Sequence, residues 1–343
     1  MDQFHTGGSH YEVGYSIGRR FADELHGGFD RCPQLPKMRA FYQTATGQAF
    51  VQALIRTNRD RFPGYMAELE GTAQGAERSL DDLQLMNLRG ELEPHLGSAA
   101  VKGCTDCAVV DGQVALIGHN EDGTPALCGR LFVLHVRVEN GPALSALVYP
   151  GILPGNALGF NERGVCFSVD SLSLRQTTVG LGRHFVARSL LEACSLDDAL
   201  ARATVPGAAA GFSYTIGSIP ERRVVVVEQA PGACHVHEVR GAYVHTNHYR
   251  HLPEVGQEIS PSSRMRLEHG IQLIAATPRA DAASVLSVLG DRSGGEYLLY
   301  RDATPPDSSA TLSTSLFDLD AQRLFIYPGH PLQADSEPLE LVM

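Results

Sequence analysis

The chain has 343 residues, of which 43% are hydrophobic and 20% are charged, and its formal net charge is −11. This apolar content over this length predicts a folded protein with a sizeable core and excludes a disordered chain. The acidic balance argues against a nucleic-acid partner, and apolar runs such as 224–227 are too short to cross a membrane.

The chain termini and cysteines predict a cellular compartment. The first residues, MDQFHTGGSH, lack the basic and apolar segments of a secretory signal, so we expect a cytoplasmic location. Seven cysteines spread over a long chain make a disulfide framework unexpected. Most of them are therefore expected to be small buried residues.

The elements change character once along the chain. The first hundred residues are predicted to be helical, with apolar residues at helical spacing. After Gly97 the pattern becomes short strands and turns, interrupted by two helical segments. The segments in order are three hairpins (107–120, 131–149, 158–172), a helical segment (183–203), a meander (212–239), a helical segment (262–290) and a closing hairpin (311–331). This order predicts an α+β protein with layered antiparallel sheets in one structural domain.

Gly103-Cys104 lies at the boundary between the helical and the strand-rich parts. A cysteine thiolate is a strong nucleophile once its proton has been accepted, and glycine adopts backbone angles that other residues do not. Attack of the thiol on the carbonyl of Gly103 would make Cys104 a new N-terminus. Its α-amine, with a pKa of about 7.7–8.0, would then serve as a base near pH 7. The alternative is a buried structural cysteine.

Two other patterns suggest competing chemistry. Cys104 and Cys107 form a CxxC, which occurs in redox pairs and zinc sites, although no second CxxC is present. Histidines are concentrated near the end of the meander, and together they would form a zinc site or remain packing and surface residues. They are His235, His237, His245, His248 and His251.

Two polar segments are candidates for positioning groups. Gly118–Gly123 contains an imidazole, an amide and two carboxylates; an acid there would position a nearby amine, although turn chemistry alone also explains these residues. Ser262–Arg266 carries two arginines, one of which would hold a carboxylate unless the segment is simply a helix cap with surface arginines.

The order of these motifs resembles the penicillin acyltransferase family (peptidase C45) of N-terminal-nucleophile (Ntn) hydrolases, over nearly the whole chain. The opening G-x-x-Y-E-x-G-x-x-x-G is present, and the closing 315–331 resembles the family's last hairpin. The segments that carry the resemblance are Gly8–Gly18, Glu68–Ala76, Asn87–Glu91, Gly103–Thr105, Gly118–Asp122, Gly159–Gly164, Thr246–His248 and Ser263-Arg264.

The resemblance implies a four-layer αββα sandwich of two antiparallel sheets between helical layers. It also implies self-cleavage between Gly103 and Cys104, which gives a helical chain 1–103 that stays associated with a chain 104–343. Cys104 would be the nucleophile and base, Asp122 would fix its α-amine, and Asn247 would help to form the oxyanion hole or would orient the acyl carbonyl.

Further residues are implied as supporting or substrate-binding groups. Arg264 resembles the arginine beside the nucleophile in the choloylglycine branch, and His248 adjoins Asn247. Asp170 stands where relatives often have asparagine, and an anion there favours a cationic amine rather than an oxyanion. His119 stands where several relatives have arginine or glutamine, and Gly123 stands where an aromatic residue is common.

The sequence thus predicts a self-activating cysteine amidohydrolase that acts on linear amides of small acyl-amines through a Cys104 thioester. Hydrolysis is favoured, and an acyl-CoA-dependent N-acyltransferase is the alternative. The expected partners are a small acyl-amide, or else an acyl-CoA or a β-lactam, without a cofactor, a metal, a nucleic acid or a membrane. Hypotheses of another class are a zinc protein built on the histidines and a catalytically silent binding protein.

Overall fold

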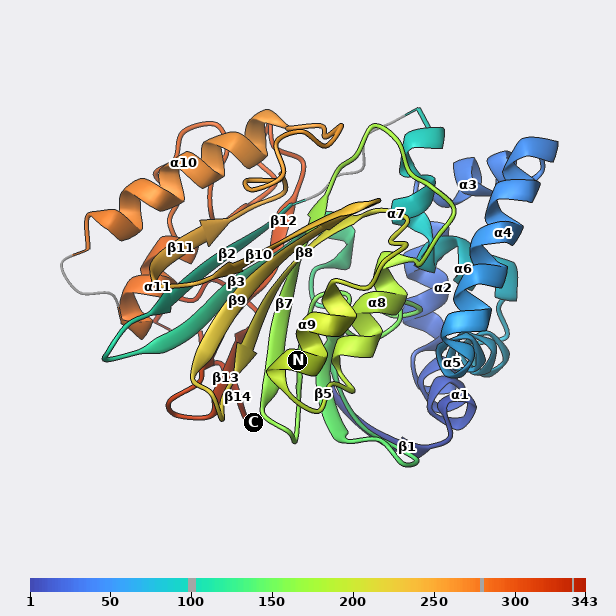
Figure 1. Ribbon diagram of the computed structural model, residues 1–343, viewed down its shortest axis with the longest axis horizontal. Helices are drawn as coiled ribbons and strands as arrows, with labels where there is room; N and C mark the ends of the chain where they lie inside the picture. Colours follow the sequence, from blue (N-terminus) through green and yellow to red (C-terminus); the bar gives the residue numbers. More distant parts are fainter. Residues whose placement is uncertain (98–102, 278–280, 335) are drawn as a thin grey trace.

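Two stacked β-sheets form the centre of the molecule, and helices cover the outer face of each (Figure 1). The computed structural model describes residues 1–97, 103–277, 281–334 and 336–343. Helices and sheets follow in the order helix, sheet, sheet, helix. The expected αββα sandwich is therefore confirmed.

The first part of the chain is a short strand followed by a series of helices, which gather beside the sandwich (Figure 1). Ser9 and Glu12 form a capping box that fixes the start of the first helix, because each side chain accepts a hydrogen bond from the other residue's backbone N–H. The elements are β1 (Gln3–Gly8), α1 (His10–Arg20), α2 (Ala22–Asp30), α3 (Leu35–Tyr42), α4 (Ala45–Arg61), α5 (Pro63–Gly75), α6 (Leu80–Asn87), α7 (Arg89–Leu92) and η1 (Glu93–His95).

The larger sheet has the strand order β1-β4-β5-β6-β7-β8-β9-β10. Its strands after β1 are β4 (Phe132–Val138), β5 (Ala143–Val148), β6 (Leu158–Asn161), β7 (Val165–Leu172), β8 (Gly211–Ser218), β9 (Arg223–Ala230) and β10 (Ala233–Glu238). All neighbouring strands are antiparallel except β1 and β4, which are parallel. Helices α8 (Arg183–Leu190) and α9 (Leu196–Ala203) lie between β7 and β8 in sequence.

The smaller sheet has the order β11-β2-β3-β12-β13-β14. Its strands are β2 (Gly103–Val110), β3 (Ala115–Gly123), β11 (Gly241–His245), β12 (Ala310–Asp318), β13 (Arg323–Tyr327) and β14 (Leu339–Val342). Helices α10 (Pro261–Ala275) and α11 (Ala282–Leu289) cover its outer face, and η2 (Pro125–Leu127) follows β3. Every pair of neighbouring strands in this sheet is antiparallel.

Three apolar layers hold the sandwich together. Between the sheets, Ile117 and Phe317 of the smaller sheet belong to the same buried cluster as Val226 of the larger one. Two outer clusters join the larger sheet to α1, α8 and α9, and the smaller sheet to α10 and α11. Burial of apolar surface is worth about 25 cal/mol per Å², so these three layers provide most of the driving force for folding.

The hairpins and helical segments predicted from the sequence are confirmed, whereas two edge strands were not expected. β1 lay within the part predicted to be helical, and β14 was not predicted. β1 contains Phe4 as its only large apolar residue, so it carries no strand alternation, and it pairs only with β4 at the sheet edge. Local pattern therefore could not reveal these strands.

The segment before Gly103 is bound to the rest of the chain by more than apolar packing. β1 extends the larger sheet, and the buried Glu68 carboxylate of α5 forms an ion pair with Arg188 of α8 at 3.0 Å. The Asn87 side chain donates to the carbonyl of Gly151 and accepts from the N–H of Leu153. In the part of the chain that the structure describes, none of the helices has the length and apolarity needed to cross a membrane.

Candidate active site

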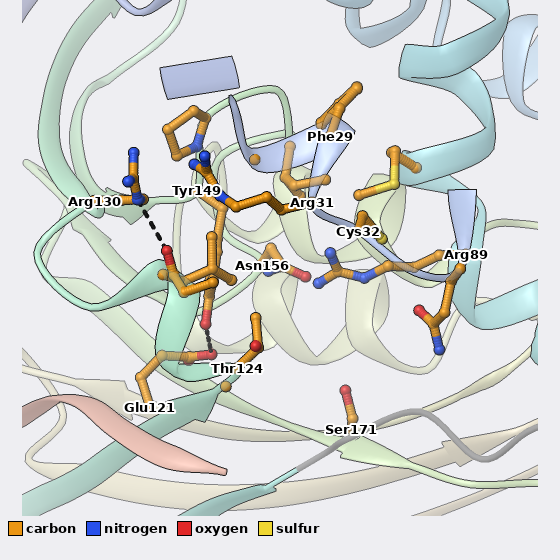
Figure 2. A pocket seen from close by; sticks show the side chains of 18 of the residues that line it. Phe29, Arg31, Cys32, Arg89, Glu121, Thr124, Arg130, Tyr149, Asn156 and Ser171 are labelled. Atoms are coloured by element: carbon orange, nitrogen blue, oxygen red, sulfur yellow. Dashed lines mark hydrogen bonds between the residues drawn. The ribbon is translucent and has the colours of Figure 1, made fainter. Parts of the chain in front are cut away.

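Cys104 is the second residue of β2 and lines a cavity of about 400 Å³. Strand β3 pairs with β2 in a register that sets Glu121 opposite Cys104 and Asp122 opposite Gly103. All four residues line the cavity. Its roof comes from the helical segment before Gly103, including Phe29, so both parts of the chain build the site (Figure 2).

The face of β2 and β3 that bears the Cys104 side chain carries a chain of buried polar groups. The Cys104 Sγ lies 4.0 Å from Oε1 of Glu121, which also accepts a hydrogen bond of 2.5 Å from the Tyr149 hydroxyl (Figure 2). The other Glu121 oxygen lies 3.0 Å from His119 Nε2, and His119 Nδ1 lies 2.7 Å from Asp106. Asp106, His119 and Glu121 thus form one relay that ends beside the thiol.

This environment keeps the thiol protonated in the uncleaved chain. Burial, together with the negative charge of Glu121, raises the pKa of Cys104 to about 12. His119 responds in the opposite way, because its two carboxylate neighbours raise its pKa well above the usual value although burial alone would lower it. The imidazole is therefore a cation, and the thiol needs a base before it can attack.

The backbone N–H of Cys104 points away from this relay, toward the residues that follow β11. It donates to Oδ1 of Asn247 at 3.1 Å, and Nη2 of Arg266 donates to the same oxygen at 2.7 Å. The Asn247 Nδ2 donates to the carbonyl of Ser171 at 3.1 Å. The structure thus brings Asn247 to Cys104, and the nitrogen that would become the α-amine already has a partner.

Asp122 is held in place by two further residues. Its Oδ1 accepts from the Thr311 hydroxyl at 2.7 Å, and its Oδ2 accepts from Nη1 of Arg301 at 3.4 Å. Arg301 is itself fixed by two hydrogen bonds to Asp307. Asp122 is therefore a buried, oriented carboxylate next to Gly103.

The glycine at position 103 is required for space rather than for its backbone angles. Gly103 lies in β2 with ordinary strand pairing and is not among the glycines with positive φ. A Cβ at this position would lie 1.5 Å from Nη1 of Arg301 and 3.0 Å from Oδ2 of Asp122. The predicted reason for the glycine was therefore wrong, and the close approach of Arg301 replaces it.

The arginine expected beside the nucleophile is Arg266 instead of Arg264. Arg264 is exposed on α10, whereas Arg266 is fully buried and donates to the carbonyl of Cys104 at 2.6 Å and to Thr105 Oγ1 at 2.7 Å. Helix α10 begins at Pro261, and its buried face includes 263, 266, 267, 270 and 274. The helical period thus turns position 264 toward solvent.

Asp170 lies in the polar layer between the sheets and does not line the cavity. It accepts from His245 Nδ1 at 2.7 Å, and the other ring nitrogen of His245 lies 3.2 Å from Glu228. Burial raises the pKa of Asp170 to about 6, whereas the two carboxylates raise that of His245 to about 9 against the opposing effect of burial. Asp170 therefore does not bind a substrate amine directly, because it lies outside the cavity lining and already pairs with His245.

His248 supports the Asn247 loop. Its Nδ1 lies 2.7 Å from the Ser263 hydroxyl, and the backbone N–H of Asn247 donates to the same hydroxyl. His245 and His248 thus have separate hydrogen-bond partners. Of the five histidines, His235, His237 and His251 lie together, with ring nitrogens within 4.8 Å of one another.

The Cys104–Cys107 pair does not form a redox or metal site. Cys107 packs in the apolar cluster beneath α10 and α11, whereas Cys104 faces Glu121, since residues three apart on a strand point to opposite faces. Both cysteines are free thiols.

Sequence reasoning missed Arg301, Tyr149 and Arg89 as parts of this site. Arg301 comes from a loop before β12, Tyr149 follows β5, and Arg89 projects from α7 into the cavity (Figure 2). For Arg89 there was a signal, because it lies within Asn87–Glu91, one of the segments that carry the family resemblance. The other two carry no local motif.

An αββα sandwich with a cysteine at the start of a central strand, beside an oriented aspartate and asparagine, defines an enzyme of the Ntn hydrolase and acyltransferase type. A model of the family described as acyl-coenzyme A:6-aminopenicillanic acid acyl-transferase matches residues 109–333. The chain belongs to this family.

Relatives in the family include hydrolases and acyltransferases. The chain is 28% identical over 370 residues to a β-alanyl-dopamine/carcinine hydrolase of Drosophila melanogaster, covering 97% of this chain and 94% of the relative. It is 27% identical to the acyl-coenzyme A:6-aminopenicillanic-acid-acyltransferase 40 kDa form of Emericella nidulans, covering 80% of this chain and 78% of that one. Among solved structures, a mutant of the conjugated bile acid hydrolase from Clostridium perfringens is similar over 69% of this chain and 92% of that chain, with a TM-score of 0.48 and 12% identity.

Proposed function

We propose that this chain is a cysteine amidohydrolase that cuts itself between Gly103 and Cys104 and then hydrolyses linear amides of small acyl-amines through a thioester on Cys104. The observation that carries the proposal is the position of Cys104. Its thiol faces a cavity, while its backbone nitrogen meets Asn247 and its neighbour Gly103 meets Asp122.

Self-cleavage begins with attack of the Cys104 thiol on the carbonyl carbon of Gly103. Glu121 Oε1, at 4.0 Å from Sγ, accepts the thiol proton, since no free α-amine exists at this stage. The amide C–N bond breaks, its nitrogen takes up a proton, and water then hydrolyses the thioester on Gly103. The products are a helical chain 1–103 and a chain 104–343 that starts with Cys104.

In the mature enzyme the new α-amine accepts the thiol proton, and Asp122 orients that amine. The thiolate attacks the substrate carbonyl, and Asn247 with backbone donors stabilises the oxyanion. The C–N bond breaks, the proton passes to the departing amine, and water releases the acid from the thioester. Arg266 and His248 act as positioning residues because they hold Asn247 directly and through Ser263.

The two fragments are expected to stay together without a covalent link. The parallel pairing of β1 with β4, the Glu68–Arg188 ion pair and the shared cavity all join residues on either side of the cut. Their separation would expose the apolar surface that the two parts bury against each other, which is strongly unfavourable.

The volume of the cavity favours a small amide as the substrate. A volume of about 400 Å³ lies at the lower end of the range for small-molecule sites, and an acyl-CoA would extend well beyond it. The Drosophila relative is named for β-alanyl amines, which fit this size class. An acyl-CoA-dependent N-acyltransferase remains the second candidate, because the family and the Emericella relative carry that name.

A cytoplasmic location is also proposed, and the seven free cysteines favour a reducing compartment.

The test is release of free amine from a panel of β-alanyl and acyl amides by the wild-type protein and by Cys104→Ala and Cys104→Ser variants. We expect the wild-type protein to release amine from at least one of these amides and the Cys104→Ala variant to release none. Addition of acetyl-CoA with an amine acceptor separates hydrolysis from transfer. Wild-type protein that turns over no amide, or a Cys104→Ala variant that turns them over normally, would contradict the proposal.

A further inference from the structure

Groups of opposite charge line the cavity. Arg89 of α7 extends its guanidinium into the cavity toward Asn156, and Glu121 lines it beside the thiol (Figure 2). Among the described residues, no carboxylate lies within ion-pair distance of Arg89, and no hydrogen bond fixes it. A cation that enters a concave site without a protein partner is available to an anionic ligand.

Basic side chains outnumber acidic ones in the lining of the cavity, in a protein whose formal net charge is −11. The lining contains Arg31, Lys37, Arg89, Arg130 and Arg183, against Glu24, Glu93, Glu121 and Asp122. Arginine is well suited to bind a carboxylate because its planar donors match both oxygens. The charge near Arg89 therefore favours an anion over a neutral group.

The part of the cavity beside the thiol carries an acidic group. Glu121 lines the cavity beside Cys104, and it shares the single imidazole of His119 with Asp106, so two carboxyl groups face one basic group. Glu121 Oε1 accepts from the Tyr149 hydroxyl and keeps a second lone pair for another donor. Because this oxygen lies only 4.0 Å from Sγ, it is close to any acyl group under attack.

We propose that the site selects a zwitterionic amide, in which an ammonium on the acyl group binds Glu121 and a carboxylate on the departing amine binds Arg89. This inference rests on the proposed function, because it assumes that the acyl carbon meets Cys104. An ammonium three bonds from the carbonyl carbon, as in a β-alanyl group, reaches Glu121 while the carbonyl faces the thiol. The amine then departs toward the roof, where Arg89 lies.

Binding to a Cys104→Ala variant tests the proposal without turnover. Isothermal titration compares β-alanylglycine with β-alanylglycinamide, which replaces the carboxylate by a carboxamide, and with propionylglycine, which lacks the ammonium. We expect β-alanylglycine to bind at least about tenfold tighter than either, as each charge-assisted pair is lost in one analogue. Arg89→Met should abolish the first preference and Glu121→Gln the second, while Arg89→Lys should restore part of the first. Arg240→Met, an exposed position outside the cavity, is the matched charge control.

Several results would overturn the inference. They are equal affinities within the matched pairs, no measurable binding of β-alanylglycine, and a carboxylate preference that survives Arg89→Met in a protein that melts like its parent. Tighter binding of acetyl-CoA that depends on Arg89 would also overturn it and would assign the arginine to phosphate. Failure of the proposed function is separate, because it appears as absent amine release by the wild type and leaves these affinities unchanged.

Discussion

Replacing Gly103 by alanine tests whether the tight contact at the cleavage site is needed for maturation. The added Cβ would lie 1.5 Å from Nη1 and 2.8 Å from Cζ of Arg301. To reach an ordinary contact of 3.4 Å, that nitrogen must retreat by about 2 Å. Arg301 has little freedom to do so, because it is buried and holds Asp307 through two short hydrogen bonds.

The expected result is slow self-cleavage. Displacement of Arg301 also shifts Asp122, which accepts from it and lies opposite Gly103. Misplacement of reacting groups by about 1 Å costs about a hundredfold in rate, so Gly103→Ala should slow cleavage by at least about a hundredfold. The assay is an intact-mass time course that starts as soon as the protein is synthesised.

A second glycine in the same hairpin provides the control. Gly112 lies in the turn between β2 and β3, and a Cβ there meets no atom within 4 Å. Gly112→Ala should therefore cleave at the wild-type rate. If Gly103→Ala also matured at that rate, the contact with Arg301 would not be what requires glycine at position 103.

Three further perturbations address catalysis, assembly and pH. Asn247→Ala should lower kcat by about 10²–10³, as expected for loss of an oxyanion donor worth about 2.7–4 kcal/mol, and unchanged amide turnover would remove Asn247 from that role. Arg188→Met removes the guanidinium that pairs with the buried Glu68 carboxylate and leaves it with the partly buried His10. The free energy of unfolding, measured with urea, should therefore fall by about 3 kcal/mol, and a loss below about 1 kcal/mol would show that the pair contributes little. The pKa of His245 is raised to about 9 in the folded state, so its protonation stabilises the fold fully below about pH 6.5, and this stabilisation of about 3 kcal/mol is lost as the pH rises through 9. Asp170→Asn should make the loss of stability at alkaline pH smaller, because it removes the partner of His245 Nδ1. A pH profile of stability that is the same in the variant and the wild type would contradict this role of the pair.

Much of the fold could be predicted from the sequence, because the local residue pattern and the tertiary contacts favour the same elements. The hairpin around Asp111 and Gly112 has a turn signal between two apolar runs, and β2 and β3 follow it. The helical segment 183–203 was likewise predicted, and α9 within it begins with a cap in which the Ser195 side chain accepts from the backbone N–H of Asp198. β1 was missed because its pairing with β4 is a long-range contact that its own residues do not encode.

The site was predictable only where its chemistry follows a motif. Cys104, Asp122 and Asn247 were named from the sequence, and the structure brings all three together. The prediction of Arg264 was wrong by two positions. The order of motifs does not determine which residues of a helix that begins at Pro261 face the site. Arg301 acts through its contact with Asp122, which no single-sequence pattern indicates.

Everything proposed for this enzyme depends on Cys104 becoming the N-terminus of a cleaved chain. The decisive experiment is intact-mass measurement of denatured wild-type protein beside the Cys104→Ala variant. We expect two wild-type masses, which correspond to residues 1–103 and 104–343, and one full-length mass for the variant. Wild-type protein that remains a single chain, or a Cys104→Ala variant that is cut at the same bond, would show that Cys104 does not mature in this way.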